Sequence, residues 1–221
     1  MKLPVFIFFL FCLAACDQSA KTSNAKIPKA DTVIKHDTIY INNELNWQEG
    51  FDLTHDMDID SISGKPVKFY IDNPACSPVA IDFYRGQFRP TDNNTTEALL
   101  RLVTTADNNL RPFYRWCLDK TIQVQDGALA EYTGIPAREY AERFPAEFFA
   151  YMDTDTTKGK YKDWTEAISY SGFYDEDDDR KPIDIRHRLT KKMKQHCKSC
   201  NAHIDERIER FAADCFPETK E

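Results

Sequence analysis

The sequence predicts a mainly α-helical protein, a single-domain array or bundle of about six to eight helices with at most one or two short strands near the N-terminal side. Only seven of the 221 residues are glycine, which argues against a sandwich or barrel with many tight turns. Leu, Ala, Glu, Lys and Arg, which favour helices, are plentiful. Apolar residues also recur at spacings of three and four, the period of a helix with one buried face.

Two short strands and a first helix are expected in the N-terminal part. Thr32–Ile41 contains β-branched residues in partial alternation, which predicts either a short strand or an extended part of the linker. A further strand is expected over Lys65–Asp72. Ser77 followed by Pro78 is typical of a helix start, and Gly86 is typical of the residue after a helix end.

The next stretch contains an apolar stripe spaced by 4, 3, 4, 3 and 4 residues. Thr95 or Thr96 is the expected N-cap, and the polar segment 107–109 is expected to divide the stripe into two helices, the second over residues 110–124. The stripe consists of Leu99, Val103, Ala106, Leu110, Phe113 and Cys117.

A succession of short helices should follow. Gly134 and Pro145 are expected to act as boundaries, and the polar residues 153–163 as a loop. The helices are expected over residues 128–133, 136–143, 145–152 and 164–170.

The clearest helical pattern lies near the C-terminus. Its apolar stripe spans residues 185–215 and would form a helix about 45 Å long if unbroken. A bend is expected at residues 199–201. The stripe consists of Ile185, Leu189, Met193, Cys197, Cys200, Ile204, Ile208, Phe211 and Cys215.

The first residues predict a secretory leader. Met1 and Lys2 are followed by an apolar run that is too short to span a membrane, for which about 20 residues are needed. The leader ends in Leu13-Ala14-Ala15-Cys16, which resembles the lipobox of bacterial lipoproteins. The resemblance implies cleavage before Cys16, a diacylglyceryl group on its sulfur and usually an acylated amino terminus (a palmitate, for example).

The expected organisation and location follow from that leader. Residues 1–15 are predicted to be a signal peptide, 16–45 the lipidated cysteine and a flexible tether, and 46–221 a single helical domain. The protein would then be anchored through Cys16 in the bacterial cell envelope, with the domain on a tether about 30 Å long. The sequence does not determine which membrane carries it.

The charge of the chain limits its partners. The formal charge is −7 and becomes −8 when the leader, with Lys2 as its one charged residue, is removed. An acidic chain argues against binding to nucleic acid or to anionic lipid, both of which require clustered Lys and Arg. Contact with the membrane is therefore expected through the N-terminal lipid alone.

Five cysteines remain once Cys12 is lost with the leader and Cys16 is lipidated. An exported protein can keep disulfides, and five is an odd number, so at most two bridges can form unless a metal binds some of the thiols. One hypothesis is a bridge from Cys117 to Cys197 or Cys200. The disulfide candidates are Cys76, Cys117, Cys197, Cys200 and Cys215.

A metal site is an alternative near the C-terminus. His196, Cys200 and His203 would share one face of a continuous helix, as zinc ligands could. Because both Cys197 and Cys200 also fall on the apolar stripe, core or disulfide cysteines are the preferred interpretation. No metal, cofactor or catalytic residue is predicted, since the sequence has no Gly-x-Ser-x-Gly elbow and no phosphate-binding glycine loop.

Aromatic residues are concentrated between Tyr140 and Tyr174. Three of them, Tyr161, Trp164 and Tyr174, stand beside polar or acidic loops and are predicted to form an exposed recognition surface. The expected function is therefore a lipid-anchored, non-enzymatic binding or scaffold module with a protein or glycan partner. Two alternatives remain open: an immunity or inhibitor protein that neutralises a toxin or enzyme, and a metal-dependent hydrolase that uses the region His187–His203.

Overall fold

The mainly α-helical fold is confirmed by the computed structural model, which describes residues 59–174, 181–198 and 200–218. Within these ranges there are nine α-helices, two short 3-10 helices and one antiparallel pair of two-residue strands. The leader, Cys16, the tether and the predicted strand Thr32–Ile41 lie outside the described residues and stay predictions.

The elements follow one another closely along the chain. They are β1 (Ser61–Ile62), β2 (Lys65–Pro66), α3 (Val67–Ile71), α4 (Pro78–Tyr84), α5 (Asn94–Arg101), η1 (Leu102–Thr104), α6 (Arg111–Val124), α7 (Gly127–Arg143), α8 (Pro145–Met152), α9 (Gly159–Tyr170), η2 (Ser171–Tyr174), α10 (Pro182–His196) and α11 (Ala202–Cys215).

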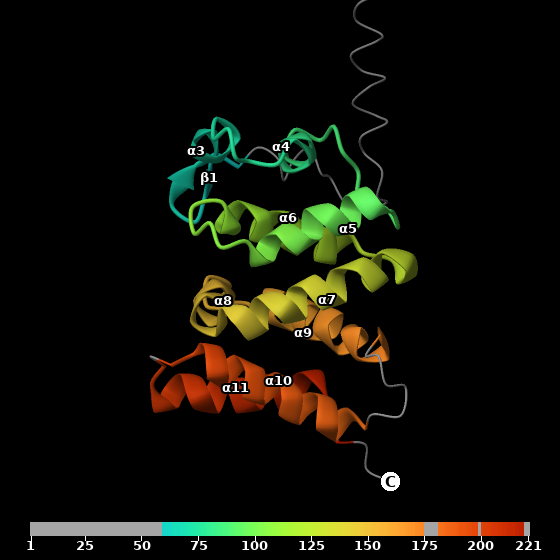
Figure 1. Cartoon of the computed structure of the whole chain (residues 1–221), viewed down its shortest axis with the longest axis vertical. Coiled ribbons are helices and arrows are strands. Elements are labelled where there is room, and N and C mark those ends of the chain that lie inside the picture. Colours follow the sequence, from blue (N-terminus) through green and yellow to red (C-terminus); the bar gives the residue numbers. More distant parts are fainter. Residues whose placement is uncertain (1–58, 175–180, 199, 219–221) are drawn as a thin grey trace, which may run out of the picture. The chain divides into compact units, whose positions relative to one another are not determined.

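The helices are stacked in the order of the sequence (Figure 1). The β-hairpin, α3 and α4 lie over α5 and α6, followed by α7, α8 and α9, and then by the α10–α11 hairpin. Direct contacts join α4 to α6, α5 to α7, α7 to α9, and α9 to α11. These contacts join helices two places apart in the sequence, and α10 also packs on α7, so the helices form a layered array.

Helix α6 joins two hydrophobic cores. Its residues Phe113 and Cys117 belong to an N-terminal core, whereas Leu118 and Ile122 belong to a C-terminal core. A helix that is buried on nearly all sides occupies the interior of a domain, and α6 has that position. None of the described helices has the length and apolar character needed to cross a membrane.

The predicted strand over Lys65–Asp72 is wrong beyond its first two residues. A tight turn at Ser63 and Gly64, both with positive φ (51° and 76°), pairs β1 with β2, and the chain then enters α3. Val67 and Tyr70 of α3 are buried three residues apart, and the Tyr70 hydroxyl donates a hydrogen bond to the Ile62 carbonyl at 2.9 Å. A helical period satisfies these contacts, and a strand would place the two side chains on opposite faces.

The N-cap of α5 is Asn93, and the predicted cap at Thr95 or Thr96 is wrong. The Asn93 side chain accepts a hydrogen bond from the Thr96 backbone N–H at 2.9 Å. Thr96 is instead buried, and its hydroxyl accepts from the Thr91 backbone N–H. The predicted break before α6 is confirmed, since α5 and α6 are separate helices.

Helix α7 is continuous through the interruption that was predicted at Gly134. Gly134 was expected to separate two helices, but it lies where α7 approaches α9 so closely that a Cβ atom would stand 2.6 Å from the Ala167 carbonyl oxygen. Pro136 also lies inside the helix. Tertiary packing between α7 and α9 therefore overrides the local preference of these residues.

The C-terminal stripe forms two helices that fold back on each other. Helix α10 ends at His196, and α11 begins at Ala202, where the Asn201 side chain accepts a hydrogen bond from the Ile204 N–H at 3.0 Å. The predicted bend is therefore a full reversal of the chain. The apolar faces of both helices remain buried because each contributes to the C-terminal core.

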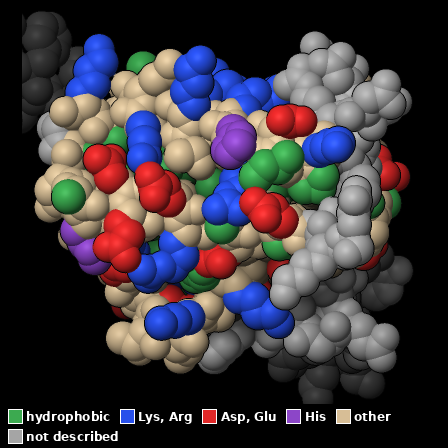
Figure 2. All heavy atoms as spheres, turned by 90° about the horizontal axis from the view of Figure 1, so that it is seen from below, with side chains coloured by type: hydrophobic (Ala, Val, Ile, Leu, Met, Phe, Trp, Pro, Cys, Tyr) green, Lys and Arg blue, Asp and Glu red, His purple; other side chains and the backbone are tan. Residues whose placement is uncertain are grey.

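The face formed at the α10–α11 end carries closely interspersed charges of both signs (Figure 2). Ion pairs of α10 and α11 include Lys194–Glu209 and Arg210–Glu206. Pairs of this kind are exposed and add little to stability.

A second kind of ion pair is buried between α6 and α8. Glu147 of α8 accepts hydrogen bonds from Arg111 Nε at 3.0 Å and from Arg115 Nη1 at 3.2 Å. The two arginine side chains are only 6% and 7% exposed, and Glu147 is 30% exposed. Tyr140 completes the network by bonding both Arg115 and Glu147.

Candidate binding site

A partly open cavity of about 400 Å³ lies where α8, the 153–158 loop, α9 and α11 meet. Its volume falls within the range of small-ligand sites, roughly 300–1,000 Å³. The lining residues are Phe149, Met152, Asp153, Asp155, Thr156, Lys158, Tyr161, Arg207, Arg210 and Asp214.

The apolar part of the cavity rests on the C-terminal core. Phe149 and Met152 are 1% and 3% exposed, and Phe149 packs edge-on against Phe211 of α11. Tyr161 of α9 contacts the same Phe211 ring at a centroid distance of 5.8 Å. These contacts fix the position of the Tyr161 ring at the edge of the cavity.

Arg207 and Asp153 form the best-defined polar contact in the cavity. The guanidinium donates two hydrogen bonds to the carboxylate, at 2.8 and 2.6 Å, and lies 4.5 Å from the centroid of the Phe149 ring. Hydrogen bonds from Arg207 lower the pKa of Asp153 below its ordinary value. Asp153 is therefore a charged and oriented hydrogen-bond acceptor.

The 153–158 loop is organised by Asp155. Its carboxylate accepts hydrogen bonds from the Thr157 N–H, the Thr157 hydroxyl and the Lys160 N–H, at 2.8, 2.6 and 2.8 Å. Lys158 has a left-handed backbone (φ 64°), which turns the chain into α9 at Gly159. Helix α9 consequently begins five residues before the predicted start at Trp164.

We predict that the Asp155 carboxyl titrates at unusually low pH in the folded protein. Hydrogen bonds from Thr157 and Lys160 lower its pKa to about 2 from an ordinary value of 3.8. These bonds favour the ionised form and exist only in the folded loop, so their contribution to stability is present above about pH 4 and is lost as the pH falls through 2. NMR titration of side-chain carboxyl carbons should show this midpoint and its loss in Asp155→Asn; a midpoint near 4 would contradict the prediction.

Tyr161 and Asp214 form a third fixed contact. The tyrosine hydroxyl donates a hydrogen bond to Asp214 Oδ2 at 2.7 Å. Burial, followed by the effect of the Asp214 carboxylate, raises the pKa of Tyr161 well above its ordinary value. Tyr161 is therefore a neutral hydroxyl group at physiological pH.

The residues predicted to form an exposed recognition surface do not share one environment. Tyr161 is half-buried and lines the cavity, but the prediction for Trp164 is wrong. Trp164 is fully buried in the C-terminal core, where its indole N–H donates a hydrogen bond to Asp119 at 2.7 Å. The polar neighbours of Trp164 along the chain gave no indication that its side chain lies in the core with a buried carboxylate partner. The side chain of Tyr174 lies outside the described part of the structure.

Sequence reasoning missed the polar residues contributed by α11. Arg207, Arg210 and Asp214 follow each other at spacings of three and four, so they share one face of the helix. That spacing was available in the sequence. The proximity of this face to the 153–158 loop depends on the α10–α11 reversal, which the sequence did not reveal.

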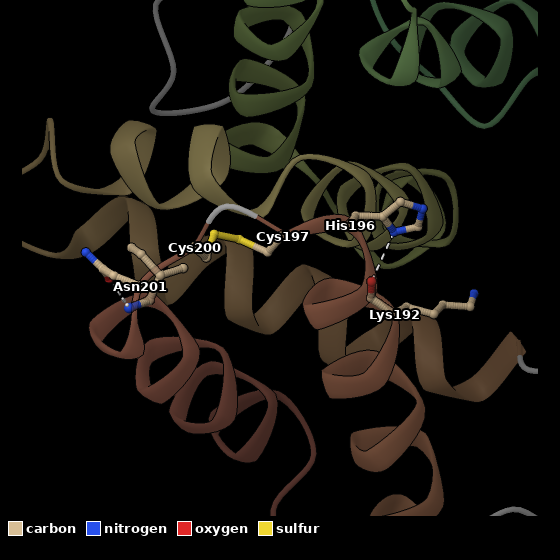
Figure 3. The surroundings of a disulfide bond; sticks show 6 residues. Lys192, His196, Cys197, Cys200 and Asn201 are labelled. Atoms are coloured by element: carbon tan, nitrogen blue, oxygen red, sulfur yellow. Dashed lines mark hydrogen bonds between the residues drawn. A yellow bond between two sulfur atoms is a disulfide. The ribbon is translucent and has the colours of Figure 1, made fainter.

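Two of the five cysteines that the structure describes form a local disulfide. A disulfide joins Cys197 and Cys200, whose Cα atoms are 5.2 Å apart, across the turn between α10 and α11 (Figure 3). The hypothesis of a bridge from Cys117 to either of them is therefore wrong. Cys117 is a buried free thiol in the N-terminal core, as is Cys76, and Cys215 is a buried free thiol in the C-terminal core.

The same turn separates the candidate metal ligands. His196 is the last residue of α10, where its Nδ1 lies 3.0 Å from the Lys192 carbonyl oxygen (Figure 3). His203 is exposed on α11. The sulfur of Cys200 is bonded to Cys197 and offers no thiolate. The predicted shared face is therefore wrong, and the described residues contain no group of three His, Cys, Asp or Glu side chains placed to hold a metal.

The disulfide can be detected by proteolysis, because Lys198 lies between its two cysteines. We expect trypsin to cut after Lys198 in the denatured, non-reduced protein and to leave the two flanking peptides joined through Cys197 and Cys200. Mass spectrometry should show the joined pair, and reduction should separate it. Finding separate alkylated peptides without reduction would contradict the assignment.

Comparisons of the chain with protein-family models, curated proteins and solved structures find no match.

Proposed function

We propose that the protein is a lipid-anchored binding or scaffold module of the bacterial cell envelope that recognises a protein or glycan partner through the α8–α9–α11 cavity. The anchoring at Cys16 rests on the lipobox resemblance. The binding role rests on one observation, a cavity with an apolar base and a rim of oriented polar side chains. Concave sites with few fixed polar groups are the usual form of ligand sites.

The protonation states of three polar side chains that line the cavity favour binding over proton-transfer chemistry. Asp153 and Asp155 have lowered pKa values, and Tyr161 has a raised pKa. All three therefore keep a single protonation state around neutral pH. A general acid or base works best when its pKa lies near the working pH, so these three groups suit the roles of fixed acceptors and donors.

Site-specific photo-cross-linking in the intact envelope tests this proposal. A diazirine amino acid at Thr156, which is exposed at the cavity rim, should yield a cross-linked product with a discrete increase in mass. The same amino acid at Lys68, exposed on α3, is the matched control and should yield none. Diazirines insert into protein and glycan alike, so either class of partner is detected.

The outcomes separate the proposed role from its alternatives. A product at Thr156 that is absent at Lys68 supports the binding module. A protein partner whose own enzymatic activity falls on binding would narrow the role to an inhibitor or immunity protein. Equal labelling at both positions, or at neither, would overturn the proposal.

A further inference from the structure

The cavity contains unused hydrogen-bond donors. Lys158 Nζ has no hydrogen-bond or ion-pair partner among the residues that the structure describes. Arg210 is bonded through Nη2 to Glu206, one turn earlier in α11, and both of these side chains are about two-thirds exposed (65% and 66%). Exposed pairs at this spacing are weak, so a ligand can compete for the guanidinium.

Unused acceptors stand beside these donors. Asp214 receives the Tyr161 hydroxyl on Oδ2, and its Oδ1 has no hydrogen bond within the described ranges. Asp214 and Arg210 are separated by four residues on α11 and line the same cavity. A donor and an acceptor are thus available side by side.

The formal charges of the lining residues balance. Three cations, Lys158, Arg207 and Arg210, face three carboxylates, Asp153, Asp155 and Asp214. An anionic or cationic ligand would meet as much repulsion as attraction. A neutral ligand whose groups both donate and accept meets no such penalty, and the hydroxyl is the group with this property.

We propose that the cavity binds one ring of a neutral polyhydroxyl ligand, namely an uncharged sugar residue of a glycan. The hydroxyls would bond Asp214, Arg210 and Lys158, and the C–H face of the ring would pack on Tyr161 above the apolar base. This inference rests on the proposed function and defines the chemistry of its ligand. A single ring of 12 to 15 heavy atoms is expected to bind weakly, with a Kd on the order of 1 mM.

Methyl NMR offers a reporter inside the cavity. The chain has four methionines; Met152 lines the cavity, and Met193 lies fully buried in the C-terminal core outside the set of lining residues. The full chain would carry ¹³C-methyl methionine and be held in a detergent without a sugar head group. Glucose, glucuronate and glucosamine provide one ring with neutral, negative and positive charge.

Glucose is expected to shift the Met152 methyl signal and to leave the Met193 signal in place. Each charged analogue should bind at least about threefold more weakly, and glucose binding should not change with salt, because screening acts only on charged ligands. No Met152 shift up to about 50 mM, far above the expected Kd, would overturn the proposal. Tighter binding of either charged sugar would do the same.

Two matched arginine variants test whether glucose binds in this cavity. Arg210→Ala removes one cavity donor and should weaken glucose binding about fivefold, the equivalent of one hydrogen bond. Arg101→Ala on α5 is the control, since Arg101 pairs with Glu97 one turn earlier just as Arg210 pairs with Glu206. Equal effects of the two variants would overturn the assignment to this cavity.

The two proposals fail separately. If the Thr156 cross-link forms but no sugar binds, the sugar inference is refuted and the binding module stands. If neither is observed, both are refuted. A glycan in the Thr156 product, together with glucose binding, would support both.

Discussion

Replacing Gly134 by alanine is expected to destabilise the protein by about 2 kcal/mol, even though alanine is the better helix former. The new Cβ would stand 2.6 Å from the Ala167 carbonyl oxygen, 3.1 Å from the Ser171 N and 3.2 Å from the Ser171 Cβ. Two of these three atoms belong to the backbone, so the clash is relieved only if α7 and α9 move apart. Overpacking in such a contact costs roughly 3 kcal/mol. The higher helix propensity of alanine offsets about 1 kcal/mol of that cost.

Gly127 offers a control in the same helix. A Cβ at Gly127 meets nothing within 4 Å, so Gly127→Ala should be neutral or stabilise by up to about 1 kcal/mol. Urea denaturation of both variants, compared at equal m-value, measures the two effects. Similar midpoints for the two variants would show that the close approach of α7 to α9 does not constrain the fold.

Replacing Glu147 by glutamine is expected to destabilise the protein by about 2–3 kcal/mol. Glutamine keeps the shape of the side chain but removes the charge that compensates Arg111 and Arg115, whose side chains are only 6% and 7% exposed. Arg115 is the more sensitive partner, because its Nε is already buried without a hydrogen bond. The expected loss is below the full cost of an unpaired buried charge because Glu147 itself is 30% exposed.

The matched control is Glu166→Gln on α9. Glu166 pairs with Lys162 at 3.6 Å, and both side chains are largely exposed (64% and 74%). Its loss should change the free energy of unfolding by less than about 0.5 kcal/mol. Chemical denaturation in low and high salt would compare the free energies of unfolding of the two variants. A cost for Glu147→Gln as small as that of Glu166→Gln would show that the charge of Glu147 does not stabilise the two buried arginines.

Much of the helical content was predictable from local signals. Proline at the first turn located the starts of α4 and α8, and the polar segment 107–109 located the break before α6. These signals act through the backbone of a few adjacent residues, so they need no information on the rest of the fold. The apolar stripes likewise identified core positions such as Phe113, Leu189 and Phe211.

The candidate site was much less predictable. Tyr161 was singled out from its polar neighbours, but the same reasoning placed Trp164 on the surface although it is fully buried. Trp164 has a buried partner, Asp119 on α6, which accepts the indole hydrogen bond and is 45 residues away in the sequence. No local pattern reports a partner at that separation.

The sequence alone determined the helical class and most of the helix boundaries, because each depends on short-range spacing and composition. The tertiary structure decided three further points: that Gly134 lies at a close helix contact, that the C-terminal stripe reverses at Cys197–Cys200, and that Arg207, Arg210 and Asp214 face the 153–158 loop. All three depend on which helices meet in space. A continuous stripe permits either one long helix or two packed ones, and burial of the apolar face in a shared core favours the second.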